Sequence, residues 1–169
     1  MLCILTSPLT YRTLQAEIAS ATLSTPVVRD EEARKLVYLQ AVILEGIRIH
    51  PPPGGLLPRV TPPEGDTING VFIPGGVEIG VNTWGIMRDE DIFGPDPEMF
   101  RPERWLGLPD ARYAEMARVV DLTFGGGRFK CLGKSVAMIE LNKIIVEVRY
   151  IRSQEIQGTN DSLGFLVYA

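Results

Sequence analysis

The chain has 169 residues, of which 45% are hydrophobic, and its formal net charge is −4 at pH 7. The length suffices for one globular domain with a core, and the charge gives no reason to expect a nucleic-acid partner. No apolar run reaches the roughly 18 residues of a membrane span, and the presence of only Cys3 and Cys131 argues against a disulfide framework.

Apolar residues at helical spacing predict three helices. The first runs from Pro8 to about Ala21, and the second runs from about Glu31 to Ile49, where three prolines end it. The third begins just after Cys131 and ends near Val148. Its expected buried stripe consists of Ala137, Leu141, Ile144, Ile145 and Val148.

A stretch rich in proline and glycine separates the second and third helices. Short strands at residues 67–68 and 71–73 flank Asn69 and Gly70, a pair typical of a tight hairpin, and Val77 to Val81 is a third strand candidate. Residues 93–123 show little periodicity, which is uncommon inside a compact domain unless the segment is functional or packs against another part. The expected fold class is mainly α with a small β component (α+β).

The segment from Phe124 to Gly133 is the most informative about chemistry. Glycines at positions 125–127 allow positive φ angles and close approach to a flat ligand. Cys131 follows near the start of a helix, where unpaired amides and the helix dipole stabilise a thiolate over a thiol. A thiolate is the proximal ligand that an iron porphyrin needs for cleavage of the O–O bond.

The same residues have other interpretations. A glycine-rich turn that caps a helix, with Cys131 as a small buried hydrophobe, is the common origin of such a pattern. A phosphate loop is excluded, because Arg128 stands where that motif requires a glycine five residues before Gly133. A Cys-His nucleophile would need His50, which suits a helix-end cation better, and a redox-sensitive thiol is a weaker alternative.

Three motifs, in this order along the chain, resemble those of the cytochrome P-450 family. Residues 45–48 match its Glu-x-x-Arg motif, and residues 100–105 resemble its Pro-Glu-Arg-Phe segment. The residues that match its haem-binding loop are Phe124, Gly127, Cys131 and Gly133. The Glu-x-x-Arg motif alone is weak evidence for the resemblance, since such ion pairs are common on helices. The three motifs together are specific to the family.

The resemblance implies a haem-thiolate monooxygenase that inserts one oxygen atom from dioxygen into a small apolar organic substrate. The cofactor would be haem b, with Cys131 as the axial iron ligand, and an NADPH-dependent cytochrome P-450 reductase would supply electrons. The cofactor-binding residues would be Cys131, Phe124, Gly127, Gly133, Arg59 and Arg128, with Arg59 at a haem propionate. Lys130 and Lys134 would lie near the proximal face, where the reductase docks.

Two further groups of residues take roles from the same resemblance. Glu45, Arg48 and Arg104 would form a structural ion network, in which the guanidinium of Arg104 can hold Glu45 in a bidentate pair. Gly54, Gly55, Leu56 and Leu57 would form part of the substrate wall. Residues 72–76 and 82–85, with the aromatic residue that follows Arg128, resemble a fungal branch that includes pisatin demethylases.

The resemblance covers about residues 7–148 and corresponds to roughly the last third of such an enzyme. We therefore expect a single partial domain over residues 1–169, with residues 149–169 as a divergent tail. The chain alone is expected to bind haem weakly and to be inactive, because burial supplies much of a cofactor's affinity. The alternative is a truncated, non-enzymatic remnant without haem. An intact member would be expected at the endoplasmic reticulum membrane, although the chain matches no anchor.

Overall fold

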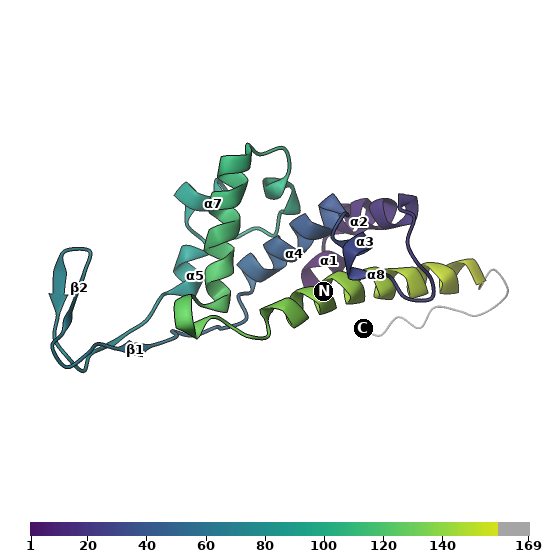
Figure 1. Ribbon diagram of the computed structural model, residues 1–169. Helices are drawn as coiled ribbons and strands as arrows, with labels where there is room; N and C mark the ends of the chain where they lie inside the picture. Colours follow the sequence, from purple (N-terminus) through teal and green to yellow (C-terminus); the bar gives the residue numbers. More distant parts are fainter. Residues whose placement is uncertain (159–169) are drawn as a thin grey trace, which may run out of the picture. The chain divides into compact units, whose positions relative to one another are not determined.

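The computed structural model describes the backbone of residues 1–158 and the side chains of residues 1–148 (Figure 1). Its described part is mainly helical with short antiparallel strands, so the predicted α+β class is confirmed. The chain divides into two compact units, residues 44–130 and residues 1–43 together with the chain from Cys131 onward. Of the predicted divergent tail, residues 159–169 lie outside the described residues.

The first unit is helical. Its elements are α1 (Leu2–Leu5), α2 (Pro8–Ser20), α3 (Asp30–Ala33), the start of α4 (Val37–Ile49) and α8 (Lys134–Gly158). Helix α2 confirms the first predicted helix, and its residues Leu14 and Ile18 are buried as their spacing indicates. The second predicted helix is wrong in one respect, because residues 34–36 interrupt it and separate α3 from α4.

A side chain of α2 explains where α4 begins. The carboxylate of Glu17 accepts hydrogen bonds from the amides of Tyr38, at 2.7 Å, and Leu39, at 2.9 Å. Both amides belong to the first turn of α4, where a helix has no internal acceptor for them. Glu17 therefore caps α4 and favours a start at Val37 over a helix continuous with α3.

A second carboxylate orders the start of α3. The side chain of Glu32 accepts hydrogen bonds from the Ser24 hydroxyl at 2.6 Å, the Ser24 amide at 3.0 Å and the Arg29 amide at 3.1 Å. These bonds, that of the Ser24 hydroxyl first, lower the pKa of Glu32 from 4.5 to about 2. Because the folded-state pKa lies below the unfolded one, this stabilisation is complete above the unfolded pKa and is lost as the pH falls toward 2.

Glu32→Gln is expected to weaken the acid sensitivity of the fold. The wild-type free energy of unfolding should fall as the pH is lowered from about 5 to about 2.5, and that of Glu32→Gln should fall less, because the amide does not titrate. Urea unfolding at a series of pH values measures both. Glu31→Gln, at an exposed position of the same helix, is the control and should keep the wild-type slope. A wild-type slope in Glu32→Gln would contradict the assignment.

Helix α8 confirms the third predicted helix but buries a different face. It continues to Gly158 instead of ending near Val148. Asn142, Ile145 and Val146 are buried, whereas Ile144 and Val148 of the predicted stripe are exposed. The predicted stripe was therefore wrong in part, because the buried face has a polar side chain at its centre.

The second unit contains the strands. β2 (Asp66–Ile68) and β3 (Val71–Ile73) form the predicted hairpin, with φ angles of 50° at Asn69 and 80° at Gly70, as a type I′ turn requires. β4 (Glu78–Ile79) confirms the third strand candidate. It pairs antiparallel with β1 (Arg59–Val60), a partner that the sequence did not indicate.

Residues 93–123 are more regular than predicted. They include the 3-10 helix η1 (Pro102–Trp105), helix α7 (Asp110–Asp121) and the start of the 3-10 helix η2 (Leu122–Phe124). Helix α5 (Thr83–Ile86) precedes this stretch, and α6 (Glu90–Phe93) ends at its first residue. The prediction of an irregular segment was wrong for α7. Only Met116 and Val120 of this helix are buried, so its apolar pattern is too short to predict a helix.

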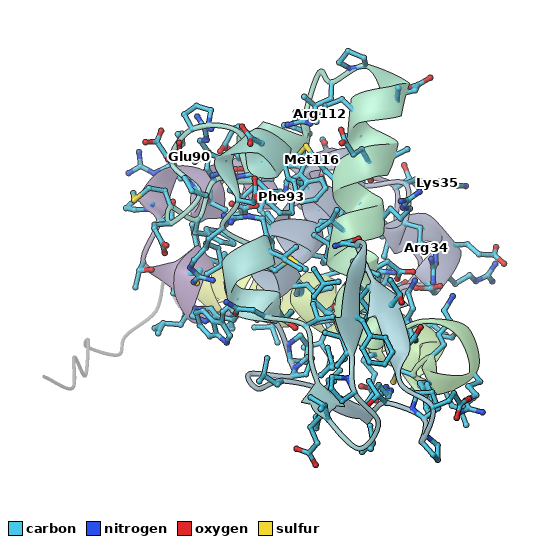
Figure 2. The ribbon with its side chains drawn as sticks, turned by 90° about the vertical axis from the view of Figure 1, so that its left-hand side faces the viewer. Arg34, Lys35, Glu90, Phe93, Arg112 and Met116 are labelled. Carbon is cyan, nitrogen blue, oxygen red and sulfur yellow. The ribbon has the colours of Figure 1, made fainter. Side chains whose placement is uncertain are left out.

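Helix α7 packs against α6, and Met116 of α7 lies near Phe93 of α6 (Figure 2). The Nη2 of Arg112 donates hydrogen bonds to the carbonyls of residues 91 and 92, each at 2.6 Å. Carbonyls at the end of a helix lack internal donors, so Arg112 stabilises the C-terminus of α6. None of the helices in residues 1–158 has both the length and the apolar character needed to cross a membrane.

Candidate functional site

The carboxylate of Glu45 lies at the centre of a buried ion network. Glu45 and Arg48 lie one turn apart on α4, and both are 0% exposed. Arg48 donates through Nε and Nη2 to the two carboxylate oxygens, each at 2.8 Å, and Arg104 donates through Nε to Oε1 at 2.9 Å. The structure thus brings the three predicted residues together, but the bidentate partner of Glu45 is Arg48 and not Arg104.

Two further donors complete the shell around this carboxylate. The backbone amide of Arg101 binds Oε1 and the indole Nε1 of Trp105 binds Oε2, each at 2.9 Å. The sequence reasoning missed Trp105, although a tryptophan in place of the family's phenylalanine supplies an N–H that needs an acceptor when buried. Glu45 therefore accepts five hydrogen bonds from three side chains and one amide.

Both guanidinium groups also bind backbone carbonyls of residues 87–99. The acceptors of Arg48 are the carbonyls of Met87 at 2.7 Å, Pro97 at 2.6 Å and Met99 at 3.0 Å. Those of Arg104 include the carbonyls of Phe93 at 2.7 Å, Asp96 at 2.8 Å and Met99 at 3.2 Å. The network therefore holds in place a segment that has little regular structure of its own.

The network stays ionised at neutral pH. Burial alone would raise the pKa of Glu45, but the Arg48 guanidinium, followed by the Arg101 amide and the Trp105 indole, lowers it below its usual value. Burial also lowers the pKa of Arg104, and the carboxylate of Glu45 offsets this only in part. A guanidinium nevertheless keeps its proton in proteins. One carboxylate thus faces two cations, and the backbone carbonyls stabilise the excess positive charge.

The loop before Cys131 has the backbone that its glycines indicate. Gly125 has φ 73° and Gly127 has φ 55°, whereas Gly126 is extended at φ −146°, so positive φ is confirmed for two of the three glycines. A Cβ atom on Gly125 would lie 2.7 Å from the carbonyl oxygen of Phe129. Real Cβ atoms do not approach so closely, so the loop needs glycine at position 125.

Cys131 is a free, exposed thiol between this loop and α8. The helix begins at Lys134, and the amide of Ala137 binds the carbonyl of Gly133 at 2.9 Å. A Cβ on Gly133 would lie 3.8 Å from the Cys131 sulfur, so the sulfur lies beside the residue that leads into the helix. The interpretation of Cys131 as a buried hydrophobe is therefore wrong.

Arg59 lies at the loop although it is distant in sequence. Its guanidinium carbon is 4.1 Å from the centroid of the Phe129 ring, and that of Arg128 is 4.7 Å from the same ring. Arg59 also donates to the carbonyls of Leu57 and Pro58. Two guanidinium groups beside one exposed ring suit an anionic group such as a carboxylate, and Phe129 as their shared contact was not predicted.

The comparisons with known proteins agree with this geometry. The family model that matches is "Cytochrome P-450", over residues 1–148. The chain belongs to the cytochrome P-450 family. Cytochrome P-450 monooxygenase ABA1 of Pyricularia oryzae is 47% identical over 152 residues, which cover 88% of this chain and 30% of that protein. Pisatin demethylase of Fusarium vanettenii is 38% identical over 143 residues, which cover 85% of this chain and 27% of that protein.

A solved structure also matches. A zebra fish cytochrome P-450 with abiraterone superposes with a TM-score of 0.70 at 29% identity, over 86% of this chain and 33% of that one. The family and the fungal resemblance predicted from the motifs are thereby confirmed. The chain spans about 30% of the length of the curated relatives it matches.

Membership of the cytochrome P-450 family implies haem, and the residues fit it. An exposed cysteine sulfur is a suitable ligand for iron, and the preceding loop adopts the positive φ angles that allow close approach of a flat group. Arg59 and Arg128 offer guanidinium groups to carboxylates.

The predicted substrate wall of the cytochrome P-450 pocket lies on the segment just before β1. All four of its residues are exposed, and this set is Gly54, Gly55, Leu56 and Leu57. The backbone of Gly80 in the β4 region approaches Leu56 so closely that a Cβ there would lie 2.8 Å from that of Leu56. The segment is therefore held at one point, and its contact with a substrate stays a prediction.

Proposed function

We propose that this chain forms the haem-ligating part of a monooxygenase that inserts one oxygen atom from dioxygen into a small apolar organic substrate. The observation that supports this most is the exposed Cys131 thiol at the end of a loop with two positive-φ glycines. The cofactor is haem b, which supplies the oxygen chemistry when bound. Cys131 would hold the haem iron, and as a thiolate it would donate electron density to the metal.

The remaining residues bind and orient in this proposal. Arg59 and Arg128 bind carboxylates of the haem, which their position around Phe129 supports. The residues that shape the loop against the porphyrin are Phe124, Gly127 and Gly133. The Glu45 network holds the segment of residues 87–99 and has no part in the chemistry.

The surroundings of the haem complete the proposal. Gly54, Gly55, Leu56 and Leu57 contact the substrate, and their small or apolar character supports an apolar one. An NADPH-dependent cytochrome P-450 reductase supplies electrons, and Lys130 and Lys134 contribute to its docking. The endoplasmic reticulum location expected for intact members stays a prediction.

The test is spectroscopic. Haemin is added to the purified chain, the iron is reduced, and the Soret band is recorded after addition of carbon monoxide. A thiolate ligand shifts this band far to the red of a nitrogen ligand, and we expect Cys131→Ser to lose the shifted band because serine is a poor iron ligand. Cys3→Ser is the matched control and should retain it.

Two outcomes would count against the proposal. The absence of a red-shifted band in the wild-type chain would favour the alternative, a non-enzymatic remnant without haem. A band that persists in Cys131→Ser would show that another group binds the iron.

A further inference from the structure

Asn142 lies at the centre of the buried face of α8 and is 0% exposed. Its Nδ2 donates to Oδ1 of Asp30 at 2.9 Å, and its Oδ1 accepts from Nε2 of Gln40 at 3.0 Å. The same Gln40 nitrogen donates to the carbonyl of Ala33 at 3.2 Å. Asp30 and Ala33 are the first and last residues of α3. The Asn142 amide therefore connects α8 with the start of α3 and with α4, and the Gln40 amide extends the network to the end of α3.

A second polar attachment lies further along the same helix. Oε1 of Glu147 accepts a hydrogen bond from the amide of Val28 at 2.7 Å. At a rise of about 1.5 Å per residue, the five-residue step from Asn142 to Glu147 spans about 7.5 Å along the helix axis. Hydrogen bonds at two heights specify both the rotation of a helix about its axis and its position along the axis, because they are directional. Apolar contacts alone specify neither well, because they have no direction.

We propose that Asn142 is a positioning residue for the Cys131 sulfur, acting through the register of α8; this role rests on the proposed function. From Lys134 onward α8 is uninterrupted, and only Leu132 and Gly133 separate it from Cys131. A slip of one residue would move the start of the helix by about 1.5 Å and rotate it by about 100°. Metal–ligand distances tolerate only about 0.2 Å, so a wrong register misplaces the sulfur.

The test separates position from stability. Asn142→Leu keeps the approximate size and removes both hydrogen bonds, and Gln40→Met is a milder variant should Asn142→Leu fail to fold. Thr10→Val is the matched control, because Thr10 is also a buried polar residue of this unit but lies on α2 and accepts from the Ser7 hydroxyl at 2.9 Å. Urea concentrations are chosen so that the variants are compared at equal stability.

The first measurement needs no haem. Spin labels are placed on Cys131 and on Glu31→Cys, an exposed position of α3, in a Cys3→Ser background, and the distance distribution between them is recorded. The parent and Thr10→Val should give one narrow distribution. Asn142→Leu and Gln40→Met should broaden it or add a population displaced by several ångströms, up to about 5 Å for a slip of one turn.

The second measurement is the red-shifted carbon monoxide band of the chain without spin labels. The fraction of haem that gives this band should fall in Asn142→Leu and stay at the parent level in Thr10→Val. Unchanged distance distributions in Asn142→Leu and Gln40→Met would overturn the proposal, even if both variants lose stability. Altered distances together with no red-shifted band in the parent chain would reject haem ligation while leaving Asn142 as the residue that places the sulfur.

Discussion

Glu45→Ala is expected to reduce the free energy of unfolding by about 3–5 kcal/mol, the usual result of removing one partner from a buried ion network. The substitution leaves two guanidinium groups, of Arg48 and Arg104, buried close together without a counter-charge. It also removes the acceptor of the Trp105 indole. Urea unfolding followed by tryptophan fluorescence measures the loss, since Trp105 reports directly on the site.

Glu98→Ala is the control for this variant. Glu98 also pairs with an arginine, Arg88, at 2.7 Å, but its side chain is 70% exposed. Solvent screens such a pair, so its removal should cost less than about 1 kcal/mol. If Glu45→Ala cost no more than Glu98→Ala, the network would not stabilise the chain, and its proposed role in holding residues 87–99 would be wrong.

Features that depend on neighbouring residues could be predicted from the sequence. The spacing of Glu45 and Arg48 places both on one helical face, and Asn69-Gly70 determines the hairpin because both residues tolerate positive φ. Helix α2 followed from the spacing of its apolar residues. In each case the interaction lies within one turn of helix or one reversal of the chain, so the local pattern contains the information.

Features that depend on residues far apart in sequence could not be predicted in this way. The start of α4 is determined by Glu17, twenty residues earlier, and no pattern within α4 shows this acceptor. The buried face of α8 was misplaced because Asn142 is polar, and polar residues count as exposed unless their partners are known. Only the folded chain shows that Asp30 and Gln40 satisfy it.

The candidate site also contains both local features, which the sequence predicts, and long-range features, which it does not. The cysteine loop was predictable, because its motif is continuous, and so was the pairing of Glu45 with Arg48. The sequence could not show which arginine forms the bidentate pair. Arg104 reaches Glu45 from η1, and its geometry depends on the path of residues 87–99. The contact of Arg59 with Phe129 is likewise invisible until the chain is folded.

Gly125→Ala is expected to disrupt the cysteine loop. With φ 73° and ψ −175°, Gly125 occupies a region that is essentially restricted to glycine, and strain there costs about 1–3 kcal/mol. The added Cβ would also lie 2.7 Å from the carbonyl oxygen of Phe129, which is backbone and cannot rotate away. Phe129 and Lys130 must therefore move, and the chain then carries Cys131 with them.

Gly126→Ala makes the same chemical change one residue further along and serves as the control. Gly126 has φ −146° and ψ 162°, and a Cβ there would meet nothing within 4 Å. Alanine at such a position can stabilise a fold by about 0.4–1 kcal/mol, because it restricts the unfolded chain. Thermal unfolding should therefore show a lower melting temperature for Gly125→Ala and no decrease for Gly126→Ala.

The carbon monoxide spectrum then separates two explanations of the glycines. If the conformation of Gly125 places the sulfur, the red-shifted band should be lost in Gly125→Ala and retained in Gly126→Ala. If the loop instead needs flexibility, both variants should lose the band in similar measure, since each removes one glycine. Equal losses of the band would contradict the requirement for glycine at position 125. The two glycines differ in backbone conformation but are equally flexible, so equal losses would point to flexibility.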